Sequence, residues 1–352
     1  MFSVKRVRSN VNVIGAGIYG TLIALRLHED GHLVRLFDEL GLLSGASAIN
    51  QFRVHAGYHY PRSHETIEEL QHSRTEFLDR FAGAIVSNSS HFYAIPQAGS
   101  QTSPEDFVAT CERHGLGLRP CWPQWMDFDY IAKCWEVDEQ VYDPDALRSI
   151  LQTDLSAAGI EVERRRVTDV NLPRADTTVW ATYGRPPSMS ILQPTRVQVA
   201  EKVLVRLPEE LRHIALVVVD GPFTAFDPYG ASELSMFGSA RYTNHWTSTK
   251  PGAQPPKALG DLLYAPTFSP CEISRFDLMR EHAALVAPSA AAAEYIGSRF
   301  ALRVVEDASD SDRRQLHIVR SDNGHIHVFS GKVVAAVQAA RLVSRIVADE
   351  VE

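Results

Sequence analysis

The chain has 352 residues, enough to bury a sizeable core and to form two domains, or one domain interrupted by another. Its net charge of -8, from 35 basic and 43 acidic residues, excludes a basic footprint for nucleic acid or an anionic membrane. The apolar runs are too short to span a bilayer and the basic N-terminus lacks the apolar core of a signal peptide, so we expect a soluble, cytoplasmic protein. The 4 cysteines form no C-x-x-C pair and have no zinc-like spacing to histidine, so no metal site is expected.

Residues 11–38 predict a strand, a glycine-rich turn, a helix and a second strand that ends in an acid. Gly15 permits a tight turn, Gly17 lets the backbone approach a pyrophosphate, and Gly20 lets the helix pack closely on the strand. Asp38 follows Gly20 by 18 residues, where its carboxylate can accept hydrogen bonds from ribose hydroxyls. The segment therefore predicts a site for an adenine dinucleotide. Its expected contacts are Gly15, Gly17, Ile18, Tyr19, Gly20, Asp38 and Glu39.

The remaining chain alternates helical and extended patterns. The predicted elements are a helix over 64–82, a strand over 92–95, a helix over 143–159, strands over 160–167, 178–181, 216–220, 234–239 and 326–329, and a helix over 332–348. Asp143 is placed to cap the second of these helices, and Pro144 suits its first position. The strands over 216–220 and 234–239 indicate a separate, more antiparallel region, whereas the C-terminus returns to a strand, a glycine turn and a helix.

This order predicts an α/β nucleotide-binding domain interrupted by a second domain. We place the nucleotide-binding domain at residues 1–75, 141–188 and 301–352, and the substrate domain at residues 76–140 and 189–300.

Two further segments accompany the glycine fingerprint in a recognisable order. Residues 44–63, SGASAINQFRVHAGYHYPRS, contain a Gly-Ala-Ser turn followed by His-x-Gly-x-x-Tyr and a proline, and residues 328–335, VFSGKVVA, contain a Gly-Lys turn. Together these motifs resemble the D-amino-acid-oxidase-like superfamily of FAD-dependent oxidoreductases, nearest to its L-2-hydroxyglutarate dehydrogenase and glycerol-3-phosphate dehydrogenase branches. Residues 190–300 match only loosely, and substrate identity would be encoded there.

The resemblance implies a Rossmann-like FAD-binding domain interrupted by a mixed or antiparallel-sheet α+β substrate domain. It also implies FAD as cofactor, although Asp38 stands where the family more often has glutamate. Further cofactor contacts are expected at Ser44, Ala46, Ser47, Val167, Ala181, Gly184, Gly331, Lys332 and Val333. Lys332 would begin a helix beside the flavin O2/N1 edge. The alternative for Lys332 is a solvated surface lysine, and the alternative for residues 44–47 is an ordinary Gly/Ser loop. The stretch before residue 178 is too compact for the usual three-stranded meander.

Residues 53–62 form the densest polar and aromatic cluster in the sequence. Arg53 or Arg62 could clamp a carboxylate or phosphate. His55, which matches the family's motif histidine, or His59 could accept a proton from a CH–OH or CH–NH group. In an extended segment, Arg53, His55, Gly57 and His59 would share one face, and Tyr58, Tyr60 and Arg62 the other. The expected catalytic residues are His55, Arg53, His59 and Tyr60, and the expected substrate contacts are Arg53, Tyr58, Arg62, Arg241 and Tyr242.

Arg241 and Tyr242 belong to a segment that also holds Asn244, His245 and Trp246, and it could roof the substrate. The same composition is typical of a structural antiparallel sheet with its turns.

These features predict an FAD-dependent dehydrogenase or oxidase that oxidises a CH–OH or CH–NH group of a small anionic or sugar-like metabolite, such as a biosynthetic intermediate, by hydride transfer to flavin N5. Dioxygen or another acceptor would take the electrons, and no second G-x-G-x-x-G provides an NAD(P)H site. The alternatives are an NAD-dependent Rossmann dehydrogenase and a non-catalytic flavin-binding scaffold or sensor.

Overall fold

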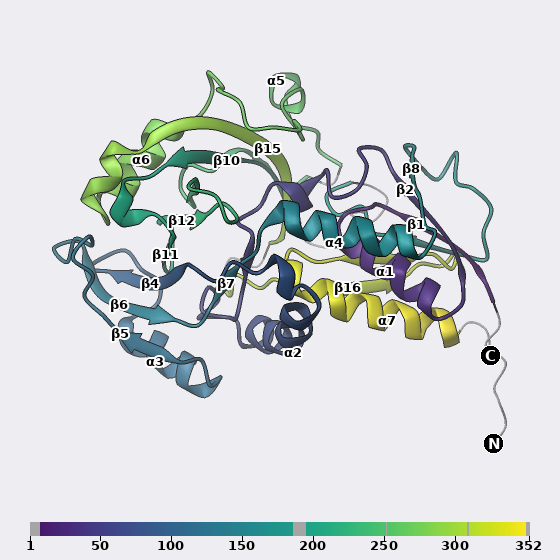
Figure 1. Cartoon of the computed structure of the whole chain (residues 1–352), viewed down its shortest axis with the longest axis horizontal. Coiled ribbons are helices and arrows are strands. Elements are labelled where there is room, and N and C mark those ends of the chain that lie inside the picture. Colours follow the sequence, from purple (N-terminus) through teal and green to yellow (C-terminus); the bar gives the residue numbers. More distant parts are fainter. Residues whose placement is uncertain (1–7, 186–194, 251, 308–309, 350–352) are drawn as a thin grey trace.

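Two large β-sheets at opposite ends of the molecule organise the chain in this computed structural model, which describes residues 8–185, 195–250, 252–307 and 310–349 (Figure 1). The first sheet has six strands in the order β16-β17-β9-β1-β2-β8, and all except β16 run parallel to their neighbours. Its strands are β1 (Asn10–Ile14), β2 (Leu33–Asp38), β8 (Val162–Arg164), β9 (Thr177–Trp180), β16 (His317–Arg320) and β17 (Ile326–Phe329).

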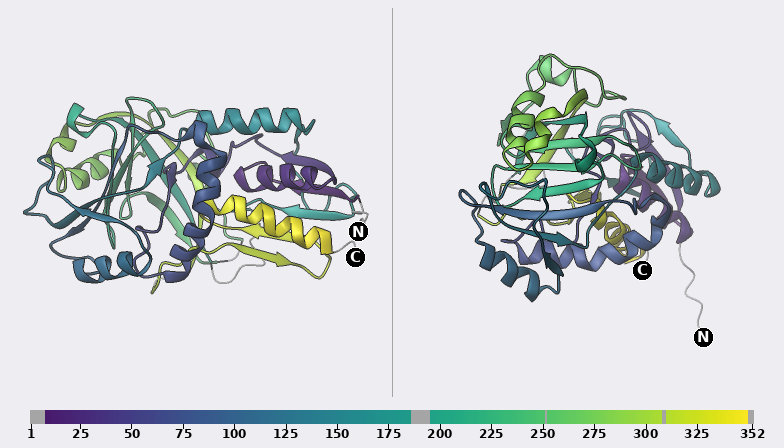
Figure 2. Two further views of the ribbon diagram at one scale, coloured as in Figure 1. Left: turned by 60° about the horizontal axis from the view of Figure 1, so that its bottom comes forward. Right: turned by 60° about the vertical axis from the view of Figure 1, so that its left-hand side comes forward.

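Four helices belong to this half of the molecule, and Figure 2 shows three of them, α4, α1 and α7, lying in a row. They are α1 (Ile18–Glu29), α2 (His64–Arg80), α4 (Pro144–Ala157) and α7 (Ala336–Asp349). Their apolar faces join the strands in one core, so Val11 and Val13 of β1 are at most 1% exposed.

The second sheet has nine strands in the order β14-β10-β13-β12-β11-β4-β6-β5, with β15 also pairing with β10. It is mixed, because β11 and β4 are parallel whereas the other ladders are antiparallel. Its strands are β4 (Ser90–Pro96), β5 (Leu118–Pro120), β6 (Ile131–Val137), β10 (Thr195–Arg206), β11 (Ile214–Val218), β12 (Thr224–Pro228), β13 (Ser235–Ser239), β14 (Asn244–Ser248) and β15 (Glu294–Glu306). The helices of this half are α3 (Pro104–Arg113), α5 (Lys257–Gly260) and α6 (Phe276–Ala284).

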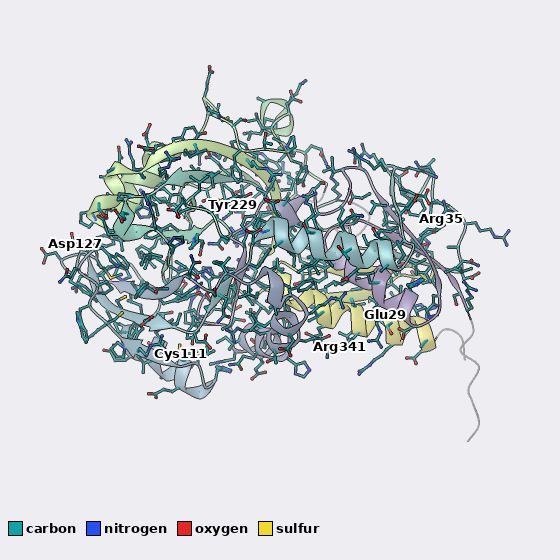
Figure 3. The ribbon with its side chains drawn as sticks, viewed as in Figure 1. Glu29, Arg35, Cys111, Asp127, Tyr229 and Arg341 are labelled. Carbon is teal, nitrogen blue, oxygen red and sulfur yellow. The ribbon has the colours of Figure 1, made fainter. Side chains whose placement is uncertain are left out.

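A short ribbon of β3 (Arg53–Val54) and β7 (Gln140–Val141) lies between the two sheets. Tyr229, just after β12, packs its ring 5.6 Å from that of Phe52 beside this ribbon. Figure 3 shows Tyr229 near the middle of the molecule, with Arg35 and Asp127 toward its opposite ends. The predicted fold class, a Rossmann-like α/β domain with a second mixed-sheet region, is confirmed.

Several predicted boundaries need correction. The strand expected over 160–167 is only Val162–Arg164, and the last helix begins at Ala336, after a 3₁₀ turn over Val333–Ala335. The domain boundary expected at residue 301 falls inside β15, and the one between 188 and 189 lies outside the described residues. Residues 165–176 form no strand, so this compact stretch holds no three-stranded meander, as expected. Among the described helices, none is both long and apolar enough to cross a bilayer.

Candidate active site

A cavity of about 1260 Å³ runs between the two sheets. It extends from the turn after β1, past Arg53 of β3 and the following His55, to the paired strands β10 and β15. Pockets for small molecules usually measure about 300–1,000 Å³, so this one is large enough for a dinucleotide together with a substrate.

The glycine turn at one end of the cavity has the geometry expected of an anion cradle. Gly15 has a φ of +105°, and a Cβ there would lie 2.5 Å from the carbonyl oxygen of Ala181. A Cβ on Gly20 would overlap the carbonyl oxygen of Gly15, so this glycine allows α1 to pack against the turn. Gly17 itself has no side chain to cap α1, and the Ser47 hydroxyl accepts the Ile18 N–H at 3.1 Å. The other N–H groups of the first turn are the ones that a diphosphate at this helix start could use.

Asp38, at the end of β2, lines the cavity and also fixes the surrounding backbone. Its carboxylate accepts hydrogen bonds from the N–H groups of Ala16 at 2.8 Å, Leu40 at 2.7 Å and Gly41 at 2.9 Å. These bonds use most of the four acceptor positions of a carboxylate. The neighbouring Glu39 forms an ion pair with Arg185 at the same wall.

Most of the other predicted cofactor residues also line the cavity. They are Gly15, Gly17, Ile18, Tyr19, Ala46, Ser47, Val167, Ala181, Gly184, Gly331, Lys332 and Val333. Gly20 and Ser44 do not; Gly20 has the packing role described above, and the Ser44 hydroxyl donates to the carbonyl of Leu42 at 3.1 Å. The Tyr19 hydroxyl donates to the Lys332 carbonyl oxygen, which holds the C-terminal turn against α1.

The segment after β3 does not keep a strand's alternation, because Gly57 turns the chain with a φ of +130°. A Cβ on Gly57 would lie 2.8 Å from the side chain of Ile67, so only glycine fits there without movement. The turn brings His55, His59 and Tyr60 together, with ring centroids 5.0–5.9 Å apart. The predicted separation of Tyr60 from the histidines is therefore wrong.

Lys332 completes this group, with its Nζ 4.1 Å from the centroid of the Tyr60 ring. It precedes the 3₁₀ turn and does not lie in the first turn of α7. Burial lowers the pKa of Lys332 to about 7. Burial, reinforced by Lys332, lowers the pKa of His55 to about 4 and that of His59 well below its usual value. Both imidazoles are thus neutral near pH 7, and each has a ring nitrogen that can accept a proton, as a weaker base than an ordinary histidine.

Arg53 does not have the free guanidinium that a substrate clamp requires. Its Nη1 donates to Glu139 at 2.7 Å, its Nε donates to Asp227 at 2.9 Å, and its Nη2 also bonds Asp227. All three side chains are at most 2% exposed. Arg62 lines the cavity but is paired with Asp220. We therefore correct the clamp assignment for Arg53 and give it a structural role.

Three other predicted substrate contacts lie away from the cavity. The Tyr58 hydroxyl donates to the Gly117 carbonyl at 2.9 Å, and its ring packs on Tyr93. Arg241 is exposed and stacks over Tyr242, which packs against His282. These positions do not support the substrate roles predicted for Tyr58, Arg241 and Tyr242.

Sequence reasoning missed several cavity-wall residues and their supports. They are Glu139, Asp227, Lys202 and Arg303. Glu139 and Asp227 belong to no motif. The one available signal was a charged residue inside a long apolar strand, since Lys202 interrupts the pattern VAEKVLV of β10.

The cradle, the parallel sheet and the neutral histidines in one cavity define a dinucleotide-dependent oxidoreductase. Residues 10–203, more than half of the chain, match the family described as "DAO: FAD dependent oxidoreductase". The chain belongs to this family, and its cofactor is FAD. The helix N-terminus at the cavity wall, the glycine cradle and the long cavity fit that cofactor. The NAD-dependent alternative and the non-catalytic alternative are therefore excluded.

Similar proteins have diverse activities. The chain is 29% identical over 174 residues to the "FAD-dependent monooxygenase kojA" of Aspergillus flavus. The matched region is 47% of this chain and 40% of that protein, so the chain spans less than half of the relative's length. Glycine oxidase from Geobacillus kaustophilus has a similar fold, with a TM-score of 0.70 at 16% identity over 98% of this chain and 95% of that one. L-alpha-glycerophosphate oxidase from Mycoplasma pneumoniae with FAD bound has a TM-score of 0.71 at 12% identity, over 97% of this chain and 94% of that one. At these identities the solved structures establish the fold alone.

Proposed function

We propose that the protein oxidises a CH–OH or CH–NH carbon of a small metabolite. The observation that carries this proposal is the pair of neutral histidines, His55 and His59, in the wall of the cavity beside Lys332. When bound, FAD supplies a two-electron acceptor that takes hydride at N5.

The protein's part in the reaction is to accept the substrate's hydroxyl or amino proton on a histidine and to hold it there. The Nδ1 atoms of both histidines are buried and make no hydrogen bond within the described part of the chain. One imidazole takes the hydroxyl or amino proton as the C–H hydride leaves, so one proton and one hydride depart together and a C=O or C=N bond forms.

Glu139 would stabilise the resulting imidazolium. Its Oε1 lies 3.7 Å from Nδ1 of His55 and accepts the Ala56 N–H at 2.8 Å, while its Oε2 accepts the Tyr93 hydroxyl at 2.9 Å. Burial raises the pKa of Glu139, but the charge of Arg53, the interactions with His55 and the hydrogen bond from Arg53 together hold this pKa well below its usual range. A permanent negative charge therefore stands behind the proposed base.

Both substrate types have support among similar folds. The name of glycine oxidase indicates an amine substrate for that protein, and the name of L-alpha-glycerophosphate oxidase indicates a hydroxyl substrate for that one. The likeness of the motifs to the L-2-hydroxyglutarate and glycerol-3-phosphate dehydrogenase branches favours the hydroxyl here.

Anaerobic reduction of the purified yellow protein tests this function. We expect at least one compound in a panel of hydroxy acids, amino acids, sugars and sugar phosphates to bleach the visible flavin band. His55→Gln should retain FAD and slow the bleaching about 10²–10⁴-fold, whereas His72→Gln, at an exposed position of α2, should not change it. His59→Gln decides which imidazole is the base. A panel without a bleaching compound, or full rates in both the His55 and His59 variants, would overturn the proposal.

Monooxygenation is a second candidate, because the relative from Aspergillus flavus is named a monooxygenase. Labelled dioxygen separates the two. Label in the organic product supports monooxygenation, and unlabelled product with stoichiometric peroxide or reduced acceptor supports oxidation.

A further inference from the structure

Two of the four cysteines lie side by side at the edge of the nine-stranded sheet. The Sγ atoms of Cys121 and Cys134 are 3.6 Å apart. Cys134 belongs to β6, and Cys121 directly follows β5, which is the last strand of its sheet. Both cysteines lie outside the cavity wall, and the proposed reaction uses neither of them. The chain thus carries a pair of thiols whose chemistry the flavin site does not explain.

The backbone holds these two cysteines at a separation that a disulfide bond can span. The β5–β6 ladder pairs Pro120 with Trp135, so Cys121 and Cys134 are the next pair in register. The Cys121 N–H donates to the Cys134 carbonyl at 3.1 Å, which continues the ladder. Directly opposed residues of an antiparallel ladder have Cα atoms about 4.5–5.5 Å apart, and disulfides join Cα atoms about 4.4–6.8 Å apart. Rotation of the two side chains is therefore enough to bring the sulfur atoms into bonding distance.

The two thiols differ in their access to solvent. Cys134 is 4% exposed, whereas Cys121 is partly exposed and the residue after it, Trp122, is 68% exposed. Burial raises the pKa of both thiols, so both are protonated at neutral pH and react slowly there. Cys121 is therefore the thiol that a small oxidant reaches first, and Cys134 is placed to attack the oxidised sulfur.

We propose that Cys121 and Cys134 form an intramolecular disulfide bond when the protein meets hydrogen peroxide. The Cys121 thiolate attacks one peroxide oxygen, the O–O bond breaks, and a sulfenic acid and one water result. The Cys134 sulfur then attacks the Cys121 sulfur, the S–O bond breaks, and a second water leaves as the S–S bond forms. The two thiols together lose two protons and two electrons, and these reduce the peroxide to two waters.

This disulfide closes the loop between β5 and β6, a hairpin that supports the wall of the active site. The carbonyl of Gly117, just before β5, accepts the Tyr58 hydroxyl at 2.9 Å. At the other end of the hairpin, β6 leads to Glu139, whose carboxylate lies 3.7 Å from Nδ1 of His55. A crosslink that closes a short loop stabilises a protein mainly by restricting its unfolded chain. The oxidised protein therefore keeps this hairpin folded more firmly than the reduced protein does.

Treatment of the purified holoenzyme with hydrogen peroxide at about pH 8.5, where more thiolate is present, tests this site. Trypsin cleaves after Lys133, so it separates Cys121, in peptide 114–133, from Cys134, in peptide 134–148. We expect mass spectrometry of the non-reduced digest to find these two peptides joined. The number of free thiols in denaturant should fall from four to two, and dithiothreitol should restore all four. No substrate turnover is needed, so the result is independent of the proposed function.

Serine variants identify the thiols that react. Cys121→Ser and Cys134→Ser should each abolish the joined peptides, whereas Cys271→Ser, at another partly exposed cysteine, should form them like the parent. The oxidised parent should unfold about 2–5 °C above its reduced form, and oxidation should give neither of the first two variants this gain. The proposal is overturned if peroxide consumes the thiols without joining the two peptides, if it crosslinks separate molecules instead, or if the joined protein is no more stable than the reduced one.

Discussion

Arg53 lies at the centre of a buried charge network that supports the active-site wall. It bonds Glu139 and Asp227, and none of the three side chains is more than 2% exposed. Arg53→Met should lower the free energy of unfolding by about 3–5 kcal/mol, because it leaves buried carboxylates without a cation. Urea denaturation measures this change.

Arg119→Met provides the comparison for Arg53. Arg119 pairs with Glu136 on the surface, with both side chains substantially exposed, so its loss should cost at most about 1 kcal/mol. If Arg53→Met keeps its stability and instead raises only the KM for an anionic substrate, Arg53 is a substrate clamp after all.

His91 of β4 makes stability depend on pH. Burial, followed by the charge of Arg53, lowers the pKa of His91 to about 3, whereas an unfolded histidine titrates near 6.5. As the pH falls below about 6.5 the unfolded chain therefore takes up a proton that the folded chain does not. This histidine should remove about 1.4 kcal/mol of unfolding free energy per pH unit down to about pH 3 and have no such effect above pH 6.5.

Urea denaturation of His91→Gln between pH 6 and pH 5 checks the proton count. As the pH falls, the free energy of unfolding of His91→Gln should decrease less steeply than that of the parent, and the difference in slope should correspond to about one proton. His72→Gln, at an exposed position, should keep the parent's slope. Identical slopes for the parent and His91→Gln would show that another group dominates acid sensitivity.

At the level of elements, Asp143 joins α4 to the loop after β12. One carboxylate oxygen accepts the N–H groups of Asp145 and Ala146 at 2.9 Å each, and the other accepts the N–H of Ala231 at 3.0 Å. Asp143→Ala should lower the free energy of unfolding by about 1–2 kcal/mol, the upper part of the range for a helix cap.

Ser103→Ala is the matched change at the start of α3. The Ser103 hydroxyl accepts only the Asp106 N–H, at 3.0 Å, as its cap bond, so we expect a smaller loss of about 0.5–1 kcal/mol. Equal losses in chemical denaturation would mean that the bond from Asp143 to the β12 loop adds nothing.

Elements whose signals are local could be predicted from sequence. The cap at Asp143 and the spacing of Gly15 to Gly20 marked α4 and the cradle correctly, because neighbouring residues determine both. The side of the chain on which each side chain after β3 lies could not be predicted, because the φ of +130° at Gly57 depends on the packing of Ile67 against it.

Long-range partners were also beyond sequence reasoning. Arg53 meets Glu139 across 86 residues and Asp227 across 174. Sequence periodicity cannot predict such a contact. The pattern of residues 53–62 therefore suggested that Arg53 is free, whereas in the fold it is paired with two carboxylates.

At the scale of the whole molecule, the cavity has walls from both sheets, so we expect FAD binding and folding to be coupled. Arg299 of β15 reaches across the boundary, donating from Nη1 to the carbonyl of Ala48 at 2.9 Å and from Nε to that of Ala265 at 2.7 Å. It thereby holds the 3₁₀ turn Ala46–Ala48, whose first residues line the cavity. The nine-stranded sheet thus positions a loop that lines the cavity.

Removal of FAD should therefore destabilise the protein, and Arg299→Met should weaken the coupling. Restoring FAD at 100 times its Kd should raise the free energy of unfolding by about 2.7 kcal/mol. At the same FAD concentration Arg299→Met should show a smaller gain, because a less ordered 46–48 turn raises the Kd, whereas Arg206→Met, which loses only an exposed ion pair with Glu294, should show the parent's gain. Thermal unfolding of apo and FAD-loaded protein measures both quantities. A full FAD-dependent gain in Arg299→Met would mean that the loop is held by the six-stranded half alone.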